Sequence, residues 1–139
     1  MTATAPNRLW LSDITAPHTS EGKLYPCAVK DVYSNRIVGY SIDSRMKAAL
    51  AAAISQRNPQ GTLIRSDRGS QFRSKKYVRL INSAGLQGSM DRVGAYADNA
   101  AMESFFSLLQ KNVLNDKRWE TRAELRLAIV LWIEKTYLR

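Results

Sequence analysis

The chain has 139 residues, of which 45% are hydrophobic, so it is long enough to form one domain with a buried core. Its 21 Lys and Arg residues outnumber 12 Asp and Glu residues, and the resulting net charge of +9 indicates an anionic partner, most often nucleic acid. The single Cys and the single His exclude an internal disulfide and the usual Cys- or His-based zinc sites.

Three strands are predicted in the first part of the chain. After a loose lead-in over residues 1–7, the segment 9–16 (LWLSDITA) is largely apolar and predicts a buried strand. The segments 24–33 and 36–43 are rich in β-branched and aromatic residues, and short turn signals, EGK and SN, precede them. This order predicts an antiparallel meander.

The pattern then changes to alternating helices and strands. Helices are predicted over residues 46–57 and 74–84, and strands over residues 62–66 and 86–90. A helix that Asp98 caps and a last helix that opens at the capping box Thr121 to Glu124 complete the chain. We therefore expect an α/β fold with one five-stranded mixed sheet, an antiparallel meander plus two parallel strands, and helices on both faces.

Three acidic residues stand at positions that either structure or chemistry can explain. Asp13 lies inside the first predicted strand, Asp67 follows the fourth, and Glu103 lies early in the long helix. Ordinary explanations are a cap or ion pair for Asp13, a turn for Asp67 and a favourable helix dipole for Glu103. The alternative is that the three converge on Mg²⁺ or Mn²⁺, because carboxylates suit hard cations and two such ions about 4 Å apart act on phosphodiesters.

Four segments carry a resemblance to a known family. They are LWLSDIT around Asp13, VKDVYSNRIVGYS after it, IRSDRGSQF around Asp67 and SMDRVGAYADNAAMESFF around Glu103. Between Asp67 and Glu103 there are 35 residues. In these segments, their order and this gap, the chain resembles the integrase-core domain of DDE transposases from bacterial insertion sequences, which are relatives of retroviral integrases.

The resemblance implies an RNase H-like fold and one catalytic core over residues 1–139, in which Asp13, Asp67 and Glu103 are the catalytic residues and bind two Mg²⁺ or Mn²⁺ ions. Water would attack a phosphodiester at the element's end, and the freed 3′-OH would then attack target DNA. The implied partners are both DNAs and further copies of the chain, without a membrane, in the bacterial cytoplasm at the nucleoid. Two alternatives are an RNase H-like nuclease and an inactive fragment for DNA binding or oligomerisation.

Six further positions are predicted to contact DNA: Arg68, Ser70, Gln71, Asn99, Gln110 and Lys111. The first three belong to the family's active-site loop. For Asn99, one turn before Glu103, the alternatives are that it orients Glu103 or is a satisfied polar residue at the helix N-terminus. The chain departs from the family at Arg65, where His is usual, and at Gln110, where Lys is common. Family members also have an upstream helix-turn-helix region and a longer C-terminal end, so we expect this chain to be a core fragment of a longer transposase.

Overall fold

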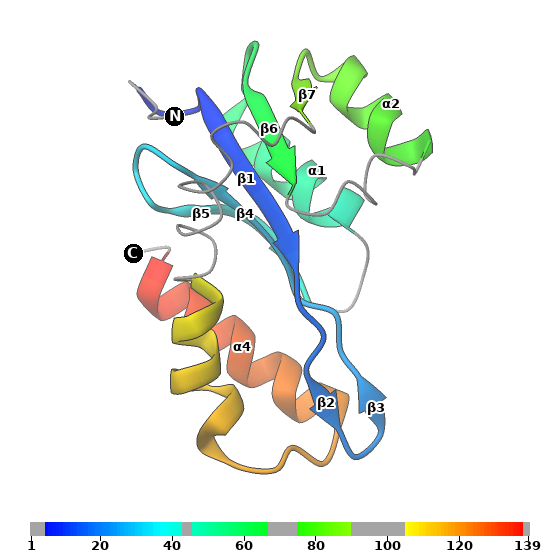
Figure 1. Ribbon diagram of the computed structural model, residues 1–139, viewed down its shortest axis with the longest axis vertical. Coiled ribbons are helices and arrows are strands. Elements are labelled where there is room, and N and C mark those ends of the chain that lie inside the picture. The colour runs from blue at the N-terminus through cyan, green and yellow to red at the C-terminus, as the bar shows by residue number, and fades with distance from the viewer. Residues whose placement is uncertain (1–4, 43–45, 67–74, 90–104, 138–139) are drawn as a thin grey trace.

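A five-stranded mixed sheet forms the centre of the computed structural model, which describes residues 5–42, 46–66, 75–89 and 105–137 (Figure 1). Its strands are β1 (Leu9–Ile14), β4 (Cys27–Asp31), β5 (Ile37–Ser41), β6 (Leu63–Ser66) and β7 (Gln87–Ser89), in the spatial order β5-β4-β1-β6-β7. β4 runs antiparallel to both β1 and β5, whereas β6 runs parallel to β1 and β7 parallel to β6. The mixed sheet that the sequence predicts is confirmed.

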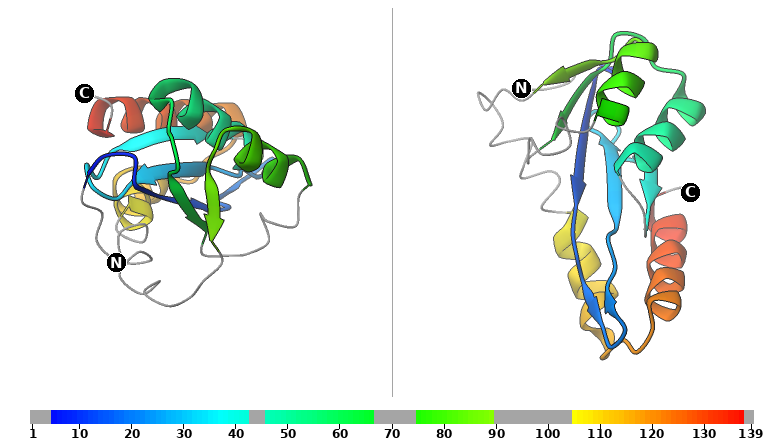
Figure 2. Two further views of the ribbon diagram at one scale, coloured as in Figure 1. Left: turned by 90° about the horizontal axis from the view of Figure 1, so that it is seen from above. Right: turned by 90° about the vertical axis from the view of Figure 1, so that its right-hand side faces the viewer.

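The strands separate two hydrophobic cores, because successive side chains point to opposite faces. Along β4, Cys27 and Val29 contribute to one core and Ala28 to the other. The first core is covered by α1 (Met46–Arg57) and α2 (Lys75–Ser83), the second by a helix over residues 105–112 and by α4 (Arg122–Tyr137). Figure 2 shows the strands between α1 and the helix over residues 105–112 (yellow). Helices on both faces are therefore confirmed.

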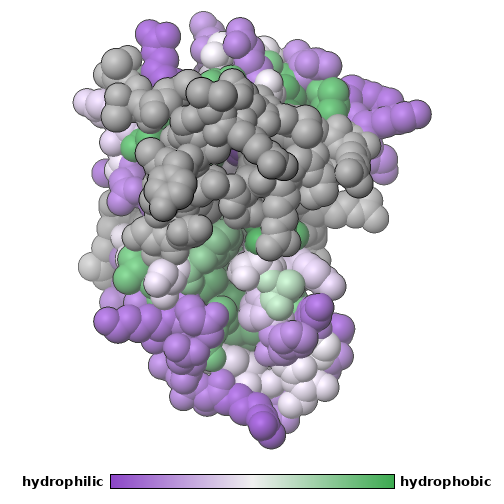
Figure 3. Space-filling view, in the orientation of Figure 1, coloured by the Kyte–Doolittle hydropathy of each residue, from purple (hydrophilic) through white to green (hydrophobic). Residues whose placement is uncertain are grey.

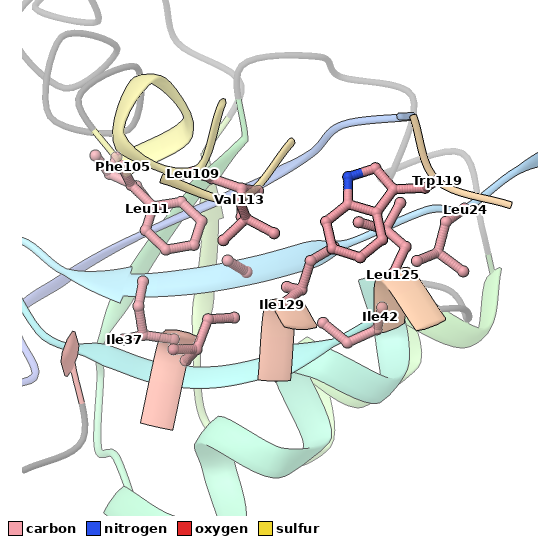
Figure 4. Close-up of a cluster of buried hydrophobic side chains, with 12 residues drawn as sticks. Leu11, Leu24, Ile37, Ile42, Phe105, Leu109, Val113, Trp119, Leu125 and Ile129 are labelled. Carbon is pink, nitrogen blue, oxygen red and sulfur yellow. The ribbon is translucent and has the colours of Figure 1, made fainter. Parts of the chain in front are cut away.

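The second core joins the two C-terminal helices to the sheet. Buried side chains recur every four residues in both segments: Phe105 and Leu109 in the first helix with Val113 directly after it (Figure 4), and Leu125, Ile129 and Ile133 in α4. They pack in one cluster with Leu11 of β1, and the Phe105 ring lies 5.6 Å from the Trp132 ring. Among the residues that the structure describes, no helix has the length and apolar character needed to cross a membrane.

A short hairpin of β2 (His18–Thr19) and β3 (Gly22–Lys23) separates β1 from β4. The sequence predicts a turn here but not the two strands, since two residues are too few to reveal a strand period. The hairpin is bound to the start of α4, where the Arg122 backbone N–H donates to Glu21 Oε1 at 2.7 Å and Arg122 Nε donates to the Lys23 carbonyl oxygen at 3.1 Å. The predicted cap of α4 is confirmed, because Thr121 Oγ1 accepts the backbone N–H of Glu124 at 3.1 Å.

The close approach of α1 to β5 requires a glycine at position 39. A Cβ added to Gly39 would lie 2.5 Å from the Ala53 backbone nitrogen and 2.8 Å from Ala53 Cβ, and it would overlap the Ala49 carbonyl oxygen. Two of these three neighbours are backbone atoms, which cannot turn away as a flexible side chain can. Gly39 is thus needed for space between helix and strand.

We predict that Gly39→Ala lowers the free energy of unfolding by about 1 to 3 kcal/mol, because the added methyl group overpacks this contact. Urea unfolding followed by circular dichroism measures the change. The double variant Gly39→Ala/Ala53→Gly is the matched control and should remain destabilised, since the backbone atoms still clash. Recovery of wild-type stability in the double variant would show instead that the Ala53 methyl group alone sets the spacing.

Candidate active site

The carboxyl ends of β1 and β6 lie side by side, because the two strands are parallel neighbours. Their register pairs Ser12 with Ser66. Asp13 is the next residue of β1, and Ser66 is the last residue of β6, directly before Asp67 in the chain. Since neighbouring strands are about 4.8 Å apart, the chain leaves β6 next to the strand position that Asp13 holds.

The backbone at Asp13 is held by the interior position of its strand. β1 is the middle strand of the five, between β4 and β6. Asp13 is paired with Ala28 of β4, and beyond the strand Thr15 N–H donates to the Pro26 carbonyl oxygen at 3.0 Å. A functional group on such a strand starts from a rigid main chain, which precise chemistry requires.

Two buried hydroxyl groups connect α2 to this end of the sheet. Ser12 Oγ donates to the Arg65 carbonyl oxygen at 3.2 Å and lies 3.4 Å from the Tyr77 hydroxyl oxygen. Both side chains are only 1% exposed. Burial raises the pKa of Tyr77 and the hydrogen bond with Ser12 opposes part of this rise, so that the pKa is about 12. The Tyr77 hydroxyl is therefore neutral near pH 7, and the bridge joins α2, β1 and β6 beside Asp13.

Two buried cations lie in the strands on either side of β1. Lys30 of β4 and Arg65 of β6 both pair with Leu11, and their side chains are 2% and 6% exposed. Burial lowers the pKa of the Lys30 ammonium group. Sequence reasoning singled out Arg65 but missed Lys30, Ser12 and Tyr77. For Lys30 the available signal is a cation inside the otherwise apolar run CAVK of a central strand.

On the opposite face of the sheet from α2, the helix over residues 105–112 packs against β1. Phe105 and Leu109 belong to the same core as Leu11, which is two residues before Asp13. Glu103 is two residues before Phe105 in the chain. The fold therefore brings the helix segment that follows Glu103 to the strand that carries Asp13.

Gln110 and Lys111 are exposed on that helix. The side-chain amide of Gln110 donates from Nε2 to Asn115 Oδ1 at 2.6 Å, so it is engaged just beyond the end of its own helix. Lys111 is the next residue, displaced by about 100° around the helix axis.

The remaining predicted site residues lie outside the described residues: Asp67, Arg68, Ser70, Gln71, Asn99 and Glu103. Within the part of the chain that the structure describes, no three His, Cys, Asp or Glu residues form a group that would hold a metal ion. The roles of the three carboxylates stay predictions, and the structure adds the strand and helix positions next to which they occur in the chain.

The integrase core domain family has a model that matches residues 3–95. The transposase for insertion sequence element IS904 of Lactococcus lactis subsp. lactis (strain IL1403) is 43% identical over 141 residues, with 97% of this chain and 56% of that protein covered. Transposase InsF for insertion sequence IS3A of Escherichia coli (strain K12) is 34% identical over 143 residues, with 99% and 50% covered. The chain spans about half the length of these curated relatives.

Solved structures share the fold at low sequence identity. The simian T-cell lymphotropic virus intasome in complex with PP2A regulatory subunit B56 gamma matches with a TM-score of 0.68 at 16% identity, covering 93% of this chain and 49% of that chain. For the catalytic domain of Mos1 mariner transposase the TM-score is 0.64 at 13% identity, with 91% and 70% covered. These likenesses confirm the predicted RNase H-like fold. The match of the family model over residues 3–95 establishes that the chain belongs to the integrase core domain family.

Proposed function

We propose that this chain is the single-domain catalytic core of a DNA transposase, which cuts DNA at the ends of an insertion sequence and joins the freed 3′ ends to target DNA. The observation that carries the proposal is the register of β1 with β6, which pairs Ser12 with Ser66 at the carboxyl ends of parallel strands. Asp13 and Asp67 each follow one of these serines in the chain. In α/β folds, functional groups gather at the carboxyl ends of parallel strands.

The names of the relatives support this activity. Two of them are transposases of the insertion sequences IS904 and IS3A. Among the solved structures, the HTLV-2 integrase catalytic core domain is in complex with magnesium, and Mos1 transposase catalytic domains were solved with Mn and with Mg. We extend both features, transposition and a divalent metal, to this chain.

The proposed ligands of two Mg²⁺ or Mn²⁺ ions are Asp13, Asp67 and Glu103. The donor set fits these ions, because carboxylate oxygens suit hard cations and the chain's one Cys and one His provide no softer set. When bound, the ions activate the attacking oxygen and stabilise the leaving oxygen of a phosphodiester. Lys30 and Arg65 are buried on the strands that flank β1, where they offset part of the negative charge of three carboxylates.

The chain's own residues position the two steps of the reaction. Pairing with β4 fixes the backbone of Asp13, and the Ser12–Tyr77 bridge fixes β1 and β6 relative to α2. In the first step water attacks phosphorus at the element's end and releases a 3′-OH. In the second step this 3′-OH attacks a phosphodiester of target DNA, whose own 3′ oxygen leaves.

The proposed DNA contacts are Arg68, Ser70, Gln71, Asn99, Gln110 and Lys111. Contact through Gln110 would replace its hydrogen bond to Asn115, whereas Lys111 is exposed and has no ion pair within the described residues. We further propose that the protein acts as a homo-oligomer on DNA in the bacterial cytoplasm, at the nucleoid. The HTLV-2 core has been solved in dimeric and trimeric forms, which supports an oligomer.

We predict that Asp13→Asn, Asp67→Asn and Glu103→Gln each reduce Mn²⁺-dependent DNA cleavage by about 100-fold or more, since ions that lose a charged ligand stabilise the transition state less, by several kcal/mol. Denaturing gels of a labelled duplex that carries the element's end sequence measure cleaved and joined products. Asp116→Asn, an exposed carboxylate of the turn Leu114–Asp116, is the matched control and should retain activity.

Each alternative function gives a distinct result in the same assay. Cleaved product without joined product indicates a nuclease of the same fold. DNA binding without metal-dependent cleavage indicates an inactive DNA-binding fragment. Cleavage that persists in EDTA or in Asp67→Asn would rule out the carboxylate–metal assignment.

For the hydroxyl bridge, we predict that Ser12→Ala and Tyr77→Phe each raise the Mn²⁺ concentration needed for half-maximal cleavage by about tenfold. The bridge holds together the ends of β1 and β6, next to which Asp13 and Asp67 occur in the chain, and groups that position metal ligands tune affinity on this scale. Each variant also loses about 1 kcal/mol of stability with its buried hydrogen bond. Ser12→Thr keeps the hydroxyl group and should restore the Mn²⁺ dependence.

Tyr40→Phe is the matched control for Tyr77→Phe. The Tyr40 hydroxyl donates to Glu134 Oε1 at 2.7 Å, and this contact joins β5 to α4. The same atom is thus removed from a different part of the fold, with a loss of stability but no change in Mn²⁺ dependence. If Tyr77→Phe and Tyr40→Phe behave alike in both measurements, the Ser12–Tyr77 bridge is only structural.

A further inference from the structure

The outer face of α2 presents three cations. Lys75, Lys76 and Arg79 are exposed, and at about 100° per residue they lie roughly opposite the buried Tyr77 and Ile81. None of the three has an ion pair within the described residues. Figure 3 shows hydrophilic side chains on the upper right of the molecule, where Figure 1 places α2.

This part of the chain has almost no acidic residues to balance its cations. Between residues 46 and 89 the sequence has one acidic residue, Asp67, and eight basic ones: Lys47, Arg57, Arg65, Arg68, Arg73, Lys75, Lys76 and Arg79. Residues 105–137, by contrast, combine six basic with four acidic residues. A surface that only needs solubility is served by mixed charges, so the one-sided charge indicates an anionic partner.

The position of the two lysines within α2 adds to this indication. Lys75 and Lys76 lie in the first turn of the helix, which has no acidic residue. The helix dipole favours acidic side chains in that turn and opposes basic ones, typically by about 0.3 to 1 kcal/mol each. The position of the two lysines therefore costs stability in the free protein. An anion that binds near them would offset this cost.

The cationic face lies close to the candidate active site. On the inner face of α2, the Tyr77 hydroxyl is 3.4 Å from Ser12 Oγ, and Ser12 directly precedes Asp13. A helix with its side chains is about 10 to 12 Å across, so the cations lie at least one helix diameter from this end of β1, on the face of the sheet opposite the helix over residues 105–112. Duplex DNA carries one negative charge per about 1.7 Å of its axis. A duplex that reacts at Asp13 therefore has several phosphates within this distance.

We infer that Lys75, Lys76 and Arg79 form a docking surface for the backbone of the duplex DNA that flanks the reacting phosphodiester. The inference rests on the proposed function and adds a contact surface outside the six DNA contacts named there. Flexible cations on a convex helix neutralise phosphates and do not read bases, so the surface binds duplex DNA of any sequence.

The test compares the salt dependence of duplex binding in two variants that lose the same charge. In K75Q/K76Q/R79Q the magnitude of the slope of log K against log salt should fall by about 2 to 3, because each lost phosphate contact contributes about 0.9. The matched control is K23Q/R118Q/K135Q, whose exposed cations lie on β3, before α4 and near the end of α4. It should keep the wild-type slope. Fluorescence anisotropy with a random-sequence 30-base-pair duplex, in EDTA, measures binding of the whole chain.

Three results would overturn the docking surface. They are an unchanged slope in the α2 variant, an equal loss of slope in the control variant, and tighter binding of wild type to a single strand of the same length than to the duplex. Thermal unfolding of both variants shows whether the fold is kept. Because binding is measured without metal, it is independent of the cleavage assay. If the α2 variant keeps the wild-type slope while cleavage still depends on the carboxylates, only the docking surface is refuted. If the α2 variant loses slope but cleavage does not depend on the carboxylates, only the proposed catalysis is refuted.

Discussion

The pairing of β1 with an antiparallel strand on one side and a parallel strand on the other determines the rest of the structure. The antiparallel neighbour β4 follows through a short hairpin connection, whereas the parallel neighbour β6 requires a crossover, to which α1 contributes. Because β1 and β6 run in the same direction, Ser12 and Ser66 reach the same edge of the sheet together. The candidate active site is a consequence of this crossover, since an antiparallel neighbour would end at the opposite edge.

The same register decides which side chains are buried on each face. A slip by one residue would exchange Trp10 and Leu11 between the two cores. It would also move Lys30 and Arg65 away from the row of Leu11, where both are buried. Burial of a cation is costly unless opposite charge lies near. Lys30 and Arg65 pair with Leu11, two residues before Asp13, at the end of the sheet where we propose that three carboxylates gather. The proposed negative charge there accounts for the cost of burying the two cations.

Features with local signals were predicted from the sequence, and features that depend on distant contacts were not. The helix over 46–57 is confirmed as α1, because the stop signal in Asn58 and Pro59 is local. The Ser12–Tyr77 bridge was not predicted, since its partners are 65 residues apart and Tyr77 reads as one more apolar member of a helix face. Lys30 resembles a surface residue until β4 is placed between β1 and β5. Spacing alone also left the roles of the three carboxylates open, and the family resemblance was needed to assign them.

The distribution of acidic residues bears on the ordinary explanation of Asp67 as a turn residue. In the hairpin and the C-terminal part, acids act as structural groups: Glu21 accepts the Arg122 backbone N–H, and Glu124 lies 3.2 Å from Lys117 Nζ. Between residues 46 and 89 the sequence has a single acid, Asp67, among eight basic residues. Asn, Ser or Gly would make the same turn without a negative charge. If these cations bind DNA, a carboxylate among them repels phosphate unless a metal ion reverses its effect, which is the role that we propose for Asp67.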